Sequence, residues 1–173
     1  MSGNSHVGGI MSHMIATVFY VGHLRPAPGT WGSLAALPVA YMIHLLGSWP
    51  LLLAAIVLVT ILGWWATARD TAGKADHDPS EIVIDEVAGQ WVALLPVSYG
   101  AAFADVSVLA LWPGLLTAFL AFRLFDIWKP GPVGWADRKP GPIGVMLDDL
   151  IAGALAALVV AVLAVLAHLP LIL

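Results

Sequence analysis

Long runs of apolar side chains constrain this fold more than any other feature of the sequence. Two of them, residues 50–68 and 150–173, contain no Asp, Glu, Lys or Arg. A helix needs about 20 apolar residues to cross the hydrocarbon core of a bilayer. A third run, residues 106–125, contains Pro113 near its start, which a first helical turn tolerates. Each of these runs predicts a membrane-spanning helix.

Two shorter runs complete the expected bundle. Residues 33–46 include Pro38, and residues 82–97 are apolar except for an acidic start and Gln90. Short spans are tolerated where the bilayer thins or neighbouring helices compensate. Residues 14–21 are too short to span, so we expect an interfacial or re-entrant segment. The predicted fold is all-α: a flexible tail over 1–13, then one polytopic domain over 14–173 with about five hydrophobic helices.

Composition excludes several classes of protein. The chain is 60% hydrophobic and 10% charged, against about 45–50% and 25% in average soluble domains. Apolar surface on that scale is not left exposed on a water-soluble monomer. The absence of cysteine excludes disulfides, thiolate metal sites and a cysteine nucleophile. Seven Lys and Arg residues are too few for a nucleic-acid-binding surface.

Five crossings in turn would place every basic residue on one side of the membrane. That side receives Arg25, Arg69, Lys74, Arg123, Lys129, Arg138 and Lys139. The opposite side receives Asp105 and no basic residue. Because cytoplasmic loops carry the excess of Lys and Arg, the charged side is predicted to face the cytoplasm.

Acidic residues also gather at the helix ends on this side. They are Asp70, Glu81, Asp85, Glu86, Asp126, Asp148 and Asp149. Charge near the hydrocarbon is costly and normally faces a bundle interior or a water-filled cavity. A divalent cation would relieve both that cost and the repulsion between carboxylates, and Mg²⁺ prefers oxygen ligands.

Spacing adds detail to this acidic group. Glu81 and Asp85 are four residues apart and would share a helical face. Arg123, Asp126 and Lys129 recur every three residues and form one stripe. A metal ion with Arg and Lys is the usual combination for holding a phosphoryl group.

The segment before the first expected helix reads Pro-Gly-Thr-Trp-Gly-Ser over residues 28–33. Either Thr30 or Ser33 can cap that helix. Its N-terminus, like those of the third and fifth helices, would point free N–H groups at an anion on the charged side.

Structural interpretations compete with these functional ones. A single helix-end acid is often only a cap. Arg123 and Asp126 can form a structural ion pair, and Lys129 can extend to the membrane interface. Asp76, Asp78 and Asp105 lie in polar loops and are expected to be solvated.

Four blocks of the sequence together resemble the phosphatidylglycerophosphatase A family. They are PAPGTWGS at 26–33, EIVIDEVAGQ at 81–90, FRLFDIWKP at 122–130 and GVMLDDLIAG at 144–153, in the family's order. The resemblance implies a Mg²⁺-dependent enzyme of the bacterial inner membrane. It would hydrolyse phosphatidylglycerophosphate to phosphatidylglycerol and inorganic phosphate.

The same blocks suggest roles for individual residues. Metal ligation is assigned to Asp85, Glu86, Asp148 and Asp149. Catalysis is assigned to Asp126, Asp149, Arg123 and Lys129, and substrate binding to Gly29, Thr30, Arg123 and Lys129. The attacking group is either a metal-activated water or an aspartate.

A non-enzymatic alternative is a small ion or proton transport protein with a one-sided acidic cluster. A transport path needs polar residues through the midplane and out of the other side. The outer half of this chain is nearly free of charge, which favours a one-sided site.

Overall fold

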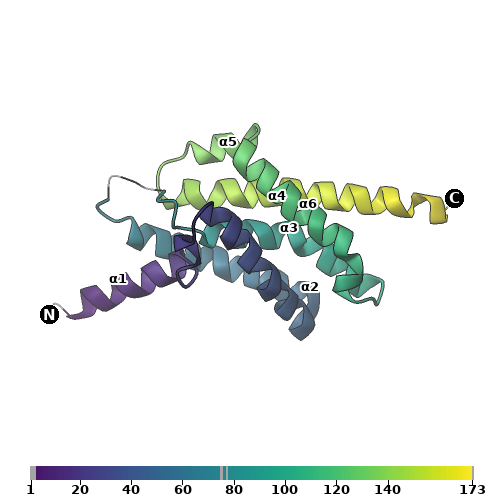
Figure 1. Ribbon diagram of the computed structural model, residues 1–173, viewed down its shortest axis with the longest axis horizontal. Coiled ribbons are helices and arrows are strands. Elements are labelled where there is room, and N and C mark those ends of the chain that lie inside the picture. Colours follow the sequence, from purple (N-terminus) through teal and green to yellow (C-terminus); the bar gives the residue numbers. More distant parts are fainter. Residues whose placement is uncertain (1–2, 75, 77, 173) are drawn as a thin grey trace.

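A computed structural model describes residues 3–74, 76 and 78–172 of the chain, and these residues form helices joined by loops (Figure 1). The prediction of an all-α fold is confirmed over this part of the chain. Met1, Ser2 and Leu173, which bound the predicted tail and the last helix, lie outside it. The elements in order are α1 (Gly3–Ala16), η1 (Val21–His23), α2 (Pro28–Asp70), α3 (Ile84–Phe103), η2 (Val108–Leu111), α4 (Trp112–Trp128), α5 (Pro132–Asp137) and α6 (Pro142–Ile172).

Three stretches have the length and composition to cross a membrane. They are α2, the segment Val108–Trp128 formed by η2 and α4, and α6 as far as Ala167. Their outward side chains remain exposed, with Leu46 at 77% and Leu158 at 60%. Because such apolar surface is stable only in an apolar solvent, these helices indicate that the protein is associated with a membrane.

The helix α2 contains both of the runs predicted as the first two helices. Its backbone leaves helical geometry at Gly47 (φ −161°, ψ 17°) and Ser48 (φ 56°, ψ −158°). Pro50 lies two residues after Ser48, and proline cannot donate the hydrogen bond that would continue the preceding helix. The chain turns back at this break (Figure 1), so residues 28–46 and 49–70 form two limbs.

The helix α3 forms the centre of the bundle. Val87, Leu94 and Val97 are buried in the main apolar core together with Leu52 of α2 and Phe122 of α4. The indole N–H of Trp91 donates to the carbonyl oxygen of Ala36 at 3.0 Å, which satisfies a polar group inside that core.

Glycines allow α3 and α6 to meet closely. A Cβ on Gly153 would lie 2.3 Å from the backbone oxygen of Gly89, and one on Gly89 would lie 2.5 Å from the backbone oxygen of Asp149. Small residues at helix contacts are typical of membrane bundles. Asp85 and Glu86 lie one turn before Gly89, and Asp149 lies one turn before Gly153. The contact therefore brings the acidic ends of the two helices together.

Three boundaries differ from the sequence prediction. The expected tail is helical over Gly3–Ala16, and the N–H of Val83 donates to the carbonyl oxygen of Ala16 at 2.9 Å. The loop expected between the last two spans contains the short helix α5. The last helix begins at Pro142 rather than near Leu150, because proline suits a first helical turn.

Candidate functional site

The carboxylates of Asp85, Glu86 and Asp149 converge where α3 and α6 begin their contact. Asp85 and Glu86 occupy the first turn of α3, as predicted. One oxygen from each of the three side chains lies within 4.8 Å of the others. Asp85 is 7% exposed and Asp149 is 2% exposed. Three carboxylates this close and this buried repel one another strongly unless a positive charge lies among them.

Several oxygens in this group, and one of the neighbouring Asp148, accept no hydrogen bond from any described residue. They are Asp85 Oδ1, Glu86 Oε2, Asp148 Oδ1 and Asp149 Oδ2. A buried acceptor without a partner is costly. Oxygen ligands alone, with neither sulfur nor imidazole, suit a hard cation such as Mg²⁺. The residues present therefore fit a magnesium ion at the place where Asp85, Glu86 and Asp149 meet.

Arg123 supplies positive charge from α4. Its Nη1 donates to Oδ2 of Asp126 at 2.5 Å, one turn along the same helix, and lies 4.0 Å from Oε1 of Glu86. The guanidinium carries five N–H donors. It therefore links the acidic group to α4 and keeps donors available for a ligand in the same space.

Lys129 supplies a second cation at the end of α4. Its backbone is left-handed (φ 51°), which ends the helix. Its ammonium donates to Oδ2 of Asp148 at 2.7 Å and to Oδ1 of Asp137 in α5. Burial alone lowers the pKa of Lys129, but these hydrogen bonds outweigh burial and hold the pKa above its usual value. The lysine therefore remains charged, and Asp148 is paired with it rather than being the fourth member of the carboxylate group.

Gly29 brings the backbone of α2 against the acidic group. A Cβ at this position would lie 2.1 Å from Oε1 of Glu86. Thr30 lies in the same turn, where its N–H donates to the oxygen of Ala27. The prediction that Thr30 or Ser33 caps this helix is wrong. The helix begins earlier, at Pro28, and the hydroxyl of Ser33 donates to the oxygen of Gly29 inside it.

A cavity of about 320 Å³ joins these groups. The predicted site residues that line it are Gly29, Asp85, Glu86, Arg123, Asp126, Lys129, Asp148 and Asp149. Thr30 is not among its lining residues. Asp70 and Glu81 also lie outside it. Glu81 precedes α3, so the helical face expected for Glu81 and Asp85 does not form.

The cavity also includes residues that the sequence did not indicate. Asp78, expected to be solvated in a loop, lines it together with Ser80. The side chain of Asp76 accepts the N–H of Asp78 at 3.0 Å, and Arg25 donates to the hydroxyl of Ser80 at 3.1 Å. These contacts shape the loop between α2 and α3. The Asp-x-Asp spacing was the only local signal available for them.

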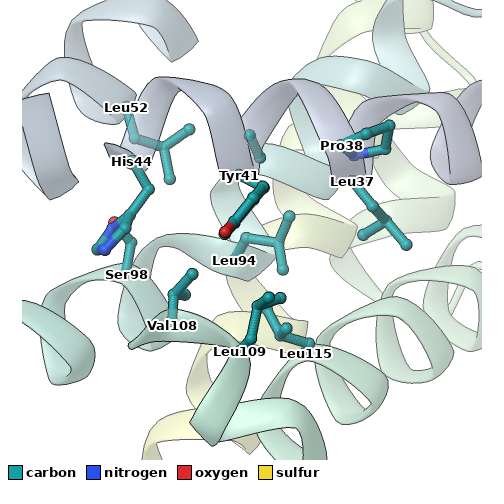
Figure 2. A pocket seen from close by; sticks show the side chains of 11 residues that line it. Leu37, Pro38, Tyr41, His44, Leu52, Leu94, Ser98, Val108, Leu109 and Leu115 are labelled. Atoms are coloured by element: carbon teal, nitrogen blue, oxygen red, sulfur yellow. The ribbon is translucent and has the colours of Figure 1, made fainter. Parts of the chain in front are cut away.

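A second cavity, of about 230 Å³, has a different character. It is lined mainly by apolar residues of α2, α3, η2 and α4 (Figure 2). Its polar contact joins His44 Nδ1 to the hydroxyl of Ser98 at 2.7 Å. Figure 2 shows these two side chains meeting at one side of the cavity. None of the charged residues that the structure describes lines it, so it lacks the positive charge that binding a phosphate requires.

The acidic cavity thus has two kinds of ligand-binding group. Carboxylate oxygens on α3 and α6 can hold a divalent cation. Arg123 and Lys129, which line the same space, can neutralise an anion. This pairing suits a phosphate ester bound between a metal ion and two protein cations.

Comparison with known proteins gives a consistent result. The profile of the phosphatidylglycerophosphatase A family matches residues 14–164. The chain is 33% identical to phosphatidylglycerophosphatase A of Escherichia coli over 146 residues, covering 84% of this chain and 78% of that protein. It is 36% identical to the Haemophilus influenzae protein of the same name over 149 residues, covering 86% and 85%.

A relative with a different name also matches. The chain is 35% identical over 153 residues to a Bacteroides thetaiotaomicron protein named as a candidate phosphatidylinositol-3-phosphatase, covering 86% of this chain and 91% of that one. No solved structure matches the chain at a significant level.

Proposed function

The chain belongs to the phosphatidylglycerophosphatase A family and is a phosphatase, and we propose that it hydrolyses the phosphomonoester of phosphatidylglycerophosphate. The products are phosphatidylglycerol and inorganic phosphate. The observation that carries this proposal is the single cavity shared by three convergent carboxylates and two cations. Membership of an enzyme family also argues against the alternative of a non-enzymatic transport protein.

Magnesium is the cofactor that the ligand set supports. Asp85, Glu86 and Asp149 would hold it, and Asp148 would contribute through water or through its pairing with Lys129. When bound, Mg²⁺ acts as a Lewis acid toward a phosphoryl oxygen and lowers the pKa of bound water.

The protein's own groups bind and orient the phosphate. Arg123 and Lys129 neutralise its non-bridging oxygens, and this interaction strengthens as charge develops in the transition state. Asp126 positions Arg123 through their 2.5 Å contact. Gly29 admits the phosphate close to the backbone at the start of α2.

Two routes for breaking the phosphorus–oxygen bond fit these groups. In one, water attacks phosphorus, the glycerol oxygen leaves with a proton, and inorganic phosphate forms directly. In the other, an aspartate such as Asp149 attacks phosphorus first and the glycerol oxygen leaves with a proton, after which water hydrolyses the acyl-phosphate. Rapid quenching followed by borohydride reduction separates them, because only the second route forms an aspartyl phosphate, which borohydride reduces to homoserine.

The enzyme is proposed to act at the cytoplasmic face of the bacterial inner membrane. The break at Gly47 and Ser48 supports two crossings within α2, which with α3, α4 and α6 gives five. The charge distribution of the loops supports the orientation. A phosphomonoester at the inner headgroup level could then reach the cavity while its acyl chains remain in the bilayer.

Phosphate release from the purified chain tests this proposal. Phosphatidylglycerophosphate in mixed micelles should be hydrolysed in Mg²⁺, and EDTA should abolish turnover until Mg²⁺ is restored. Phosphatidylinositol 3-phosphate serves as the competing substrate, since one relative carries that name. Release that is unaffected by EDTA would overturn the metal assignment. Faster turnover of the inositol lipid would overturn the substrate assignment.

A further inference from the structure

Two histidines face one another outside the acidic cavity. His13 lies in the last turn of α1 and His23 ends η1. Their Nε2 atoms are 3.1 Å apart. The other ring nitrogen of His13, Nδ1, lies 3.1 Å from Oδ1 of Asp70 at the end of α2. None of the three residues lines the acidic cavity.

The carboxylate determines which nitrogen of His13 is free. An ionised Asp70 can only accept a hydrogen bond, so the proton of neutral His13 belongs on Nδ1. Nε2 then presents its lone pair toward Nε2 of His23. Two neutral imidazoles in this arrangement can direct both lone pairs at one cation.

The spacing of the two nitrogens suits ligands of one metal ion. Zinc–nitrogen bonds of about 2.0–2.1 Å separate two ligands at roughly 90–109° by about 2.9–3.4 Å. The observed 3.1 Å falls within that interval. A carboxylate on the far nitrogen of a ligating histidine is also the usual outer-shell arrangement, which fixes the tautomer and the ring orientation.

We propose that His13 and His23 form a binding site for a divalent transition-metal ion of the zinc type, with Asp70 as the residue that orients His13. Imidazole nitrogen selects such ions over Mg²⁺, so this site and the carboxylate site take different metals. The side chain of His13 is 27% exposed and His23 is exposed, which leaves room for water molecules to complete the coordination.

Neighbouring contacts hold the two rings in place before metal binds. The ring of Tyr20 stacks on that of His23 at a centroid distance of 5.6 Å. The N–H of Gly22 donates to the oxygen of Thr17 at 3.0 Å, which keeps η1 beside the end of α1. Lys74 lies 3.3 Å from the second oxygen of Asp70, which holds that carboxylate in position. Bound metal would therefore join α1, η1 and α2.

Zinc binding by the tag-free, full-length protein tests the proposal. A chromophoric zinc chelator competes for the ion in excess Mg²⁺, which occupies carboxylate ligands. We expect one zinc equivalent per chain. His13→Gln and His23→Gln should each weaken binding at least tenfold, and Asp70→Asn by roughly 10–100-fold. His44→Gln, a histidine at the apolar cavity, is the matched control and should bind zinc as the unmodified protein does.

A spectroscopic measurement identifies the metal ligands independently. Cu²⁺ bound at the site should give an electron paramagnetic resonance spectrum with nitrogen hyperfine splitting that disappears in His13→Gln. Thermal unfolding without metal verifies that each variant is folded. Stoichiometric binding that survives both histidine substitutions, or no stoichiometric binding by the unmodified protein, would show that the two rings share only a hydrogen bond and would overturn the proposal.

Discussion

Gly29 and Glu86 are in direct contact across the start of α2 and the start of α3. A methyl group on Gly29 would overlap Oε1 of Glu86, at 2.1 Å, and would approach Nη1 of Arg123 to 3.1 Å. The backbone of one helix is therefore one wall of the space in which the carboxylate and the guanidinium meet. A side chain at residue 29 would change the site without touching the core.

Gly29→Ala should lower phosphatase activity by about 100-fold, since a misplacement of about 1 Å at a reacting centre has that effect. Glu86 can rotate away, and alanine is a better helix former than glycine. The thermal midpoint should therefore change little. Gly100→Ala is the control, because a Cβ there meets only Leu111 at 3.8 Å. Equal activity of Gly29→Ala and Gly100→Ala would contradict a close contact between residue 29 and Glu86.

Arg123→Lys should reduce turnover by about 100-fold although the charge is kept. A single ammonium cannot match the planar fork that reaches both Asp126 and the phosphate. Steady-state phosphate release checks this, with Arg69→Lys as the control because Arg69 lies over the ring of Trp65, away from the cavity. A normal kcat for Arg123→Lys would show that the guanidinium of Arg123 is not required for catalysis.

Asp149→Asn should raise the Mg²⁺ concentration needed for half-maximal activity by at least tenfold. The substitution removes one anionic ligand from a group of three and keeps the size of the side chain. Titration of activity with Mg²⁺ measures the change. Asp105→Asn, in an exposed loop with φ 53°, should leave the titration unchanged. Identical Mg²⁺ curves for all three proteins would exclude Asp149 as a ligand.

Lys129→Met should lower activity by a similar factor at pH 7.5 and at pH 9. The raised pKa of Lys129 means that its favourable pairing is complete below the ordinary lysine pKa of about 10.4 and is lost only as pH rises through the higher folded value. The loss of activity in Lys129→Met should therefore be independent of pH over the range of the assay. Lys139→Met is the control, since that ammonium lies 4.0 Å from the ring centroid of Trp135. A deficit that disappears at pH 9 would show that Lys129 loses its proton below that pH.

Gly153→Ala should destabilise the protein as well as inactivate it. The added methyl group would meet the backbone of Gly89, which cannot move aside as a flexible side chain can. Overpacking of this kind costs about 1–3 kcal/mol. Thermal unfolding in detergent should show a lower midpoint than for Gly100→Ala. An unchanged midpoint would mean that α3 and α6 are not held together here.

The sequence placed acidic residues at the ends of apolar runs, and the structure brings Asp85, Glu86 and Asp149 of that predicted group together but not Asp70 or Glu81. Asp85 and Glu86 open α3 as expected, and the stripe through Arg123 and Asp126 forms as one turn of α4. The sequence did not predict the ion-pair partners of Lys129. The expected stripe ran past Asp126, whereas the left-handed backbone at Lys129 turns its side chain to Asp137 and Asp148.

Long-range contacts account for what local pattern could not predict. The glycines of the first ten residues disfavour a helix, yet α1 forms where His13 meets Asp70 and Ser12 is buried. Asp78 lines the cavity although it lies in the loop between α2 and α3. Such contacts depend on tertiary geometry, which no periodicity in a single sequence records.

The glycine contact between α3 and α6 lies close to the carboxylates along the helix axis. Asp149 lies four residues from Gly153, about 6 Å along the axis at 1.5 Å per residue, so a change of roughly 10° in crossing angle moves it by only about 1 Å. The C-terminal end of α6 lies further from the contact, so the same change in crossing angle would displace it several times more than Asp149. Tilting is how long helices adapt to bilayer thickness. A tilt of α6 about this contact would therefore move the apolar half of the helix while changing the spacing of the carboxylates little.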